Sequence, residues 1–357
     1  MTALPTPDPI TVAAGSKILA SDWNADVRDA ILYLLGLQGG VGRRNILTNS
    51  HMDIWQRGTS FAIAASTKTY TADRWAAYRT ATGSTVSRQA GPTGQSYGLR
   101  YQRDPGNTST ADMSIMQAAT TADSMKLAGR LASLKLNLAA GANFSAASAL
   151  VTVRLVTGTG TDESPEATWT GTADALNTTQ AITTTPTDYT FDSIIIPAGA
   201  TQIKLVVSYT PVGTAGANDW IQLAAGQASA GSASGYERLP VEATLAECQA
   251  FYYQMGPYGT VASMGPVGQG ISGNRVFFML PLPTTMRTKP TITFSAANDF
   301  SVSGSITTTA MASDANTSSA IAAILATTAS GITSGDIYYI NNAADTTNAA
   351  IYCDAEL

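Results

Sequence analysis

The sequence contains few side chains that could carry out catalysis or bind a metal. It has one histidine, His51, so a serine or cysteine nucleophile paired with a histidine base would depend on that residue. A histidine-based metal cluster cannot be assembled from one imidazole. No Walker loop and no Cys-x-x-Cys motif is present. We interpret His51 as a strand or loop residue and expect no cofactor.

Three carboxylates, Asp162, Glu163 and Glu166, surround Pro165. A glycosidase needs two carboxylates on opposite sides of the scissile bond, whereas three in one loop are more typical of a solvated or cation-binding loop. Because Ca²⁺ takes oxygen ligands, the loop is a weak candidate for calcium. We therefore expect that the protein is not an enzyme. If it were one, a capsule depolymerase would be the expected type.

Sugar binding would use exposed aromatic faces, because the C–H face of a sugar stacks on a ring while its hydroxyls need polar partners. The candidates for such contacts are Trp169, in a Thr- and Gly-rich setting, and Tyr97, Tyr101 and Tyr258. Their spacing forms no pattern that selects one of them.

Composition excludes several classes of protein. Charged residues make up only 13% of the 357 residues, about half the usual share, and Thr, Ser, Ala and Gly replace them. This composition suits β-structure and surfaces covered by other subunits. The net charge of −5 and the scattered basic residues argue against nucleic-acid binding. The sequence has no stretch of 18 apolar residues, so we expect no membrane span. Residues 1–9 do not resemble a secretory signal.

The chain is expected to begin with an attachment arm, residues 1–43. Pro5, Pro7 and Pro9 favour an extended arm, and a helix is predicted over residues 21–35. Its apolar stripe includes Trp23, Val27, Ile31 and Leu34. This helix either packs on its own domain, associates with other copies or inserts into another protein.

Residues 44–254 show a β pattern. Apolar and polar residues alternate in short runs between turn signals, for example over 98–103, 131–138, 150–156 and 203–209. Strands at this spacing without intervening helices predict an antiparallel jelly-roll β-sandwich. A short helix is expected over 242–254. Residues 255–357 are predicted to form a second, smaller β-domain, in which 318–327 is either a small helix or a loop. The fold class is thus mainly β.

Two motifs mark the entry and exit of the predicted sandwich. Trp55 and Trp75 are interpreted as core aromatics. Arg57, Asp73 and Arg238 could form a polar network that joins the entry strand to the exit strand, with Asp73 accepting from an arginine. Cys248 is expected to be a buried thiol, and a disulfide to Cys353 is not favoured.

These motifs carry a resemblance to a known family. Residues 45–49 (NILTN), 53–61 (DIWQRGTSF) and 71–75 (TADRW) resemble the start of a jelly-roll module of bacteriophage fibre and spike proteins, a module similar to carbohydrate-binding modules. Four later segments resemble the C-terminal end of that module: 197–202 (PAGATQ), 219–223 (DWIQL), 236–240 (YERLP) and 248–253 (CQAFYY). Residues 19–29 resemble the N-terminal segments of many phage fibre proteins, and residues 280–283, 286–291 and 351–357 resemble their small C-terminal β-modules. Tail fibres, head fibres and the head spikes of phage-like gene transfer particles all use such modules.

The resemblance implies a virion subunit, assembled in the host cytoplasm, that attaches to host cell-surface polysaccharide. It also implies a homotrimer that contacts other virion proteins through its N-terminal arm and helix. A purely structural decoration or assembly protein is the alternative, and a capsule depolymerase is the second alternative. Linked weak sites on one particle would raise avidity without new contacts.

Overall fold

The computed structural model describes residues 45–232, 235–257, 263–303, 306–343 and 348–357. The predicted helix with Trp23, Val27, Ile31 and Leu34 lies outside these residues, as does Tyr258. The described part is mainly β with antiparallel sheets, so the predicted fold class is confirmed. The domain boundaries stay a prediction.

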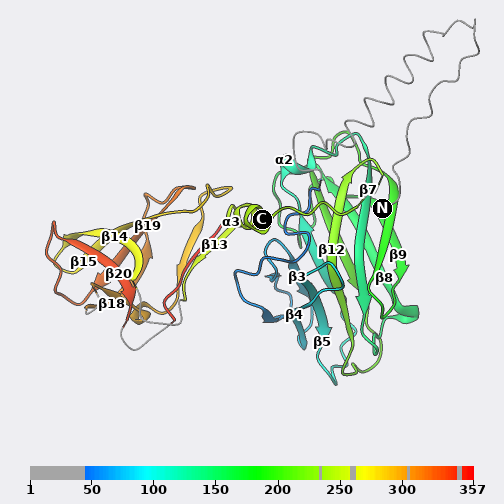
Figure 1. Cartoon of the computed structure of the whole chain (residues 1–357), viewed down its shortest axis with the longest axis horizontal. Coiled ribbons are helices and arrows are strands. Elements are labelled where there is room, and N and C mark those ends of the chain that lie inside the picture. Colours follow the sequence, from blue (N-terminus) through cyan, green and yellow to red (C-terminus); the bar gives the residue numbers. More distant parts are fainter. Residues whose placement is uncertain (1–44, 233–234, 258–262, 304–305, 344–347) are drawn as a thin grey trace, which may run out of the picture. The chain divides into compact units, whose positions relative to one another are not determined.

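Two six-stranded antiparallel sheets form the sandwich (Figure 1). The first sheet has the order β1 (Ser60–Ala62), β4 (Ser84–Ala90), β5 (Tyr97–Arg103), β12 (Trp220–Ala230), β7 (Leu131–Ala140) and β10 (Thr187–Ile195). The second sheet has the order β2 (Thr69–Tyr70), β3 (Ala76–Arg79), β6 (Met113–Ala118), β11 (Gln202–Tyr209), β8 (Leu150–Gly158) and β9 (Ala173–Ala181). Neighbours that are distant in sequence, such as β12 and β7, are typical of jelly-roll connections.

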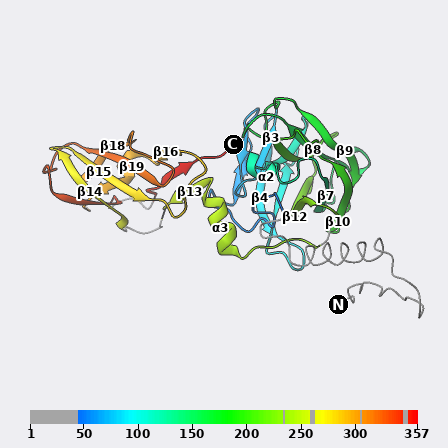
Figure 2. The ribbon, with the colours of Figure 1, turned by 90° about the horizontal axis from the view of Figure 1, so that it is seen from above.

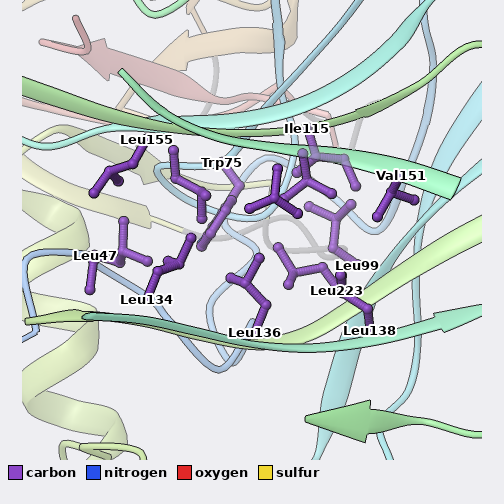
Figure 3. Packing of buried hydrophobic residues seen from close by; sticks show 14 of the residues in the cluster. Leu47, Trp75, Leu99, Ile115, Leu134, Leu136, Leu138, Val151, Leu155 and Leu223 are labelled. Atoms are coloured by element: carbon purple, nitrogen blue, oxygen red, sulfur yellow. The ribbon is translucent and has the colours of Figure 1, made fainter. Parts of the chain in front are cut away.

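Alternation along the strands builds one core between the sheets. Leu134, Leu136 and Leu138 of β7 are buried because every second residue of the strand faces the other sheet. Figure 3 shows Trp75 among these leucines, together with Leu47 and Leu155. The indole N–H of Trp75 donates to the carbonyl of Asn49 at 3.0 Å, so its one polar group is satisfied.

The C-terminal part contains a three-stranded sheet and a closed barrel. The sheet has the order β13 (Tyr252–Met255), β21 (Ile351–Asp354) and β16 (Thr291–Phe294). The barrel order is β14 (Ser263–Ser272), β15 (Arg275–Pro281), β19 (Ile321–Thr328), β18 (Ile306–Ser313), β17 (Phe300–Val302) and β20 (Ile337–Asn342). In Figure 2 the strands β14, β15, β19 and β18 lie side by side. These elements have their own apolar core, which includes Phe278 and Phe300.

The described residues contain two short α-helices, α2 (Thr121–Ser124) and α3 (Val241–Gln249), and the 3₁₀ turns Ala147–Ala149 and Ala297–Asp299. The helix expected over 242–254 is therefore shorter, because Tyr252 already pairs with Asp354 in a strand. The region 318–327 is not a helix or a loop: most of it belongs to β19, which pairs with β15 and β18. No helix within the described ranges is long and apolar enough to span a membrane.

Candidate functional site

The outer face of the second sheet carries a cleft, and strand alternation determines which residues line it. In β11, Ile203, Leu205 and Val207 face the sandwich core. Lys204 and Val206 therefore point to the opposite face. The same alternation turns Tyr78 of β3, Met116 of β6 and Val156 of β8 outward, while their neighbours in the strands enter the core.

Strand register brings these outward residues together. Met116 pairs with Ala76 on one side and with Val206 on the other. Lys204 lies opposite Val156, and Val206 lies opposite Arg154. The result is one small apolar cluster, Ala76, Met116, Val156 and Val206, on a face where a sandwich usually presents polar groups. Met116, Val156 and Val206 form the floor of the cleft.

The cleft has a volume of about 300 Å³. Tyr78 forms part of its wall beside the apolar floor, and hydroxyls and charged groups complete the lining. Its lining residues are Tyr78, Ser114, Met116, Arg154, Val156, Pro165, Glu166, Ala167, Thr168, Thr172, Lys204 and Val206. An apolar floor with a few polar groups around it is the usual composition of a small-molecule site.

Lys204 is the most unusual group in this lining. Its ammonium donates to the carbonyls of Pro165 and Ala167, each at 2.9 Å, and lies 4.5 Å from the ring centroid of Trp169. No carboxylate of the described residues pairs with it. Burial, and next the nearby Arg154, lower the pKa of Lys204 to about 8. The site thus holds a largely desolvated cation at neutral pH.

The other charged groups of the rim are paired. Arg154 donates to Asp174 at 2.8 Å, and Glu166 lies 3.4 Å from the ammonium of Lys68. Further along the same face, Asp112 accepts from the hydroxyls of Ser114 and Thr210 at 3.2 and 3.1 Å. These groups supply donors and acceptors at the surface, which is what a hydroxyl-rich ligand requires.

The aromatic residues predicted for sugar stacking lie elsewhere or are covered. Tyr101 is fully buried in the sandwich core, and Trp169 is only 3% exposed. Stacking on a sugar needs an open ring face, so both predictions are corrected. Trp169 instead supports the loop beside the cleft, because its N–H donates to Ser164 at 2.9 Å. Tyr97 is half-buried on the first sheet, with the guanidinium of Arg88 at 4.4 Å from its ring centroid.

The three carboxylates proposed for calcium bind different partners. Asp162 pairs with Arg287 at 2.8 Å, and Glu163 accepts from Gln202 at 2.7 Å. Glu166 faces Lys68. In the described ranges no group of three or more metal-binding side chains gathers at one point. The sequence spacing suggested a cluster that the loop does not form, because each carboxylate points to a separate neighbour.

The motif residues connect the sandwich to the segment that follows β21. Arg57 lies 3.3 Å from both Asp354 and Glu356, and Arg74 pairs with Glu356. The guanidinium of Arg57 also lies 3.5 Å from the ring centroid of Tyr252. Arg74 is 2% exposed and Glu356 4% exposed, so this cluster is a buried ion network.

The predicted network of Arg57, Asp73 and Arg238 does not form. Asp73 accepts from the main chain of Gln56 at 2.9 Å and from the Gln56 amide, rather than from an arginine. Arg238 pairs instead with Asp53 at 3.2 Å. Trp55 is 9% exposed, and its N–H donates to the carbonyl of Met52.

His51 and the two cysteines are buried in the structure. His51 is buried, its Nδ1 lies 3.1 Å from the hydroxyl of Ser50, and burial lowers its pKa. Cys248 and Cys353 are free and buried.

Sequence reasoning missed Tyr78 and Lys204. Their outward direction follows from the parity of their strands, since Ala77 and Ile203 are the inward neighbours. The cleft, however, depends on the spatial order β3, β6, β11 and β8 in the sheet. This order brings together strands that are far apart in the sequence, and no local pattern predicts it.

No protein-family model matches the sequence, and no curated protein matches it. Among solved structures, a family 4 carbohydrate-binding module is similar at 14% identity and a TM-score of 0.32, over 51% of this chain and 98% of that one. A family 22 carbohydrate-binding module of Clostridium thermocellum Xyn10B is similar at 12% identity and a TM-score of 0.31, over 48% and 99%. The enzymatically active domain of bacteriophage CBA120 tailspike protein 4 is similar at 10% identity and a TM-score of 0.31, over 52% and 21%. Similarities at this distance concern the β-sandwich fold alone.

Proposed function

We propose that the chain is a glycan-binding subunit that acts without catalysis, and that its ligand occupies the cleft of the second sheet. The observation that carries this proposal is the composition of the cleft. The half-buried ring of Tyr78, beside an apolar floor, suits the C–H face of a sugar ring, and Lys204, Ser114 and Thr168 supply polar groups around it.

Lys204 favours a sugar that bears an acidic group. Its ammonium donates to two carbonyls and lies over the Trp169 ring, and no carboxylate of the described residues forms an ion pair with it. Hydrogen bonds between a charged donor and a charged acceptor are stronger than neutral ones. We therefore expect acidic polysaccharides to bind more tightly than neutral ones of the same linkage.

The resemblance of the entry and exit motifs extends the proposal to a virion. On that basis the chain is a fibre or spike subunit that attaches a phage or phage-like particle to host surface polysaccharide. The resemblance also implies three copies in each fibre. Each cleft is small, so tight attachment would come from many copies on one particle.

The test is a glycan array with the full chain, followed by calorimetric titration of the best acidic oligosaccharide. We expect Tyr78→Ala to weaken binding at least tenfold, with an unchanged circular dichroism spectrum. Tyr97→Ala on the first sheet is the matched control and is expected to bind like the original chain. Loss of binding in Tyr97→Ala but not in Tyr78→Ala would show that the ligand binds to the first sheet, and this would contradict the proposal.

A further inference from the structure

One wall of the cleft is a loop, residues 159–172, that joins β8 to β9. We call it the cleft loop. It supplies five of the residues that line the cleft: Pro165, Glu166, Ala167, Thr168 and Thr172. The cleft therefore keeps its shape only while this loop keeps its position on the second sheet.

Two residues of β11 fasten the cleft loop to the sheet. The ammonium of Lys204 donates to the carbonyls of Pro165 and Ala167, each at 2.9 Å. The amide of Gln202 accepts from the main-chain N–H of Glu163 at 2.6 Å and donates to the carboxylate of Glu163 at 2.7 Å. These contacts place the main chain of the loop over Lys204.

The cleft loop also contacts residues 355–357, which follow β21 and which we call the strap. Arg287 joins the loop to the strap. Its guanidinium donates to the carboxylate of Asp162 in the loop at 2.8 Å, and to the carbonyls of Ala355 and Glu356 in the strap at 3.1 and 3.2 Å. One side chain thus holds the two segments together.

A second connection between the loop and the strap runs through Lys68. Its ammonium donates to the main-chain oxygen of Leu357 at 2.6 Å and lies 3.4 Å from the carboxylate of Glu166. The side chain of Leu357 is buried against Ala118 and Trp169, and Trp169 belongs to the loop. The strap therefore supports the loop through an apolar contact as well as through charged groups.

Asp162 is the point at which the loop, the strap and α2 meet. One of its carboxylate oxygens accepts from the main-chain N–H and the hydroxyl of Thr121, at 2.9 and 3.0 Å. The other oxygen accepts from Arg287. Because both oxygens have fixed partners, Asp162 cannot move without breaking contacts to two separate elements.

We propose that Arg287 and the strap hold the cleft loop in the position in which the cleft accepts its ligand. This inference rests on the proposed function. None of the lining residues named above belongs to the C-terminal elements, yet these elements would be needed for the shape of the site. Arg287 is then a positioning residue, which acts on the ligand through the loop.

The titration of Lys204 reports the position of the loop in the full chain without any ligand. It can be measured by trace acetylation with acetic anhydride over a range of pH, with the Lys204 peptide quantified by mass spectrometry. The original chain should show the low pKa of about 8, which burial produces. Arg287→Ala should release the loop, admit water to the ammonium and raise this pKa toward its ordinary value. Arg287→Lys keeps a cation beside Asp162 and should give a smaller rise.

Arg275→Ala is the matched control, because Arg275 is an exposed arginine at the start of β15. It should leave the titration of Lys204 unchanged. The charged groups that act on Lys204 are Arg154 of β8, Asp174 of β9, and Glu163 and Glu166 of the loop. None of the substitutions alters these groups, so a shift would report a movement of the loop.

Asp162→Asn breaks the same ion pair from the side of the loop and keeps an acceptor for Thr121. It should raise the pKa of Lys204 in the same direction, and it provides the test if Arg287→Ala does not fold. Calorimetric titration should show that an acidic oligosaccharide binds at least fivefold more weakly to both variants, and that Arg287→Lys restores part of the affinity.

A pKa of Lys204 that is the same in these variants as in the original chain would overturn the proposal, whatever happens to binding. An original chain that binds no acidic glycan would overturn the proposed function instead. The titration of Lys204 would then still decide whether the strap positions the loop.

Discussion

At the scale of single residues, the buried charges explain why motif residues far apart in the chain occur together. Glu356 lies between Arg57 and Arg74 and is 4% exposed. Removing one member of a buried ion group leaves the others desolvated and uncompensated, which costs about 3–5 kcal/mol. Arg57 and Arg74 of the entry motif are thus structural partners of the residues at the end of β21, whereas Arg57 was predicted with Asp73 and Arg238 and no partner was predicted for Arg74.

Glu356→Gln keeps the shape of the side chain and removes its charge. We expect it to lower the free energy of unfolding by about 3 kcal/mol, measured by urea denaturation. Glu242→Gln is the control, because Glu242 is exposed near the start of α3, and its change should stay below about 0.5–1 kcal/mol. Equal effects of the two substitutions would show that the ion network contributes nothing to stability.

The titration of Lys204 gives the proposed site a pH dependence. With a pKa of about 8, the ammonium is mostly charged at pH 7 and mostly neutral at pH 9. Binding of an acidic sugar should therefore weaken as the pH rises from 7 to 9, since the cation is lost. Lys204→Met should bind more weakly at pH 7 and show a flat profile over this range. Calorimetric titration at several pH values measures both, and a flat profile for the original chain would exclude Lys204 as the binding cation.

At the scale of elements, the alternation of inward and outward side chains along a strand explains which predictions were confirmed. The strands at 98–103, 131–138, 150–156 and 203–209 follow from their alternation, and the structure has strands there. The same alternation places Tyr101 on the buried side with Leu99, so the sequence already contained the argument against an exposed ring. The cleft, by contrast, depends on the order β3, β6, β11 and β8, which is a tertiary property.

The strand β19 shows how tertiary contacts override local preference. Its run of alanines, Ala322, Ala323 and Ala326, is typical of helices. In the barrel these residues are fully buried and pair with the larger side chains of Leu280, Met279 and Val276 in β15. Small residues suit that position because bulky neighbours fill the interior.

A buried arginine binds the main chain of two loops at one end of the sandwich. Arg79 of β3 is fully buried and donates to the carbonyls of Ala111, Thr82, Gly83 and Ser109. Lysine has fewer donors and a different shape. We expect Arg79→Lys to lower the free energy of unfolding by about 2 kcal/mol, because buried carbonyls lose their partners. The exposed Arg130→Lys should be close to neutral, and a similar loss in both would contradict this role. Thermal and urea denaturation measure the difference.

At the scale of the whole molecule, the described residues of the compact unit 46–357 contain two large apolar cores. One lies in the sandwich around Trp75, and the other lies in the C-terminal elements around Phe278. Buried ion pairs of Arg57 and Arg74 with Glu356 join the sandwich to the C-terminal elements, so we expect the two cores to unfold as one cooperative unit.

Calorimetry should therefore show one unfolding transition. Phe278→Ala removes a fully buried ring of the C-terminal core, at a cost of about 3–5 kcal/mol, and should lower the temperature of that transition. Leu136→Ala in the sandwich should lower the same transition, at a cost of about 2–5 kcal/mol. Two transitions, of which each substitution lowers only one, would show that the two cores unfold separately.

The burial of both cysteines has a practical consequence for thiol chemistry. Cys353 is fully buried and Cys248 is 1% exposed, and burial raises the pKa of Cys353 to about 12. Because thiolates are the reactive form, neither native sulfur should react with a maleimide while the protein is folded. A cysteine introduced in place of Ile195, which is 71% exposed on β10, would then be selectively labelled. A fluorophore at that position would give the folded protein a single optical probe on the first sheet of the sandwich.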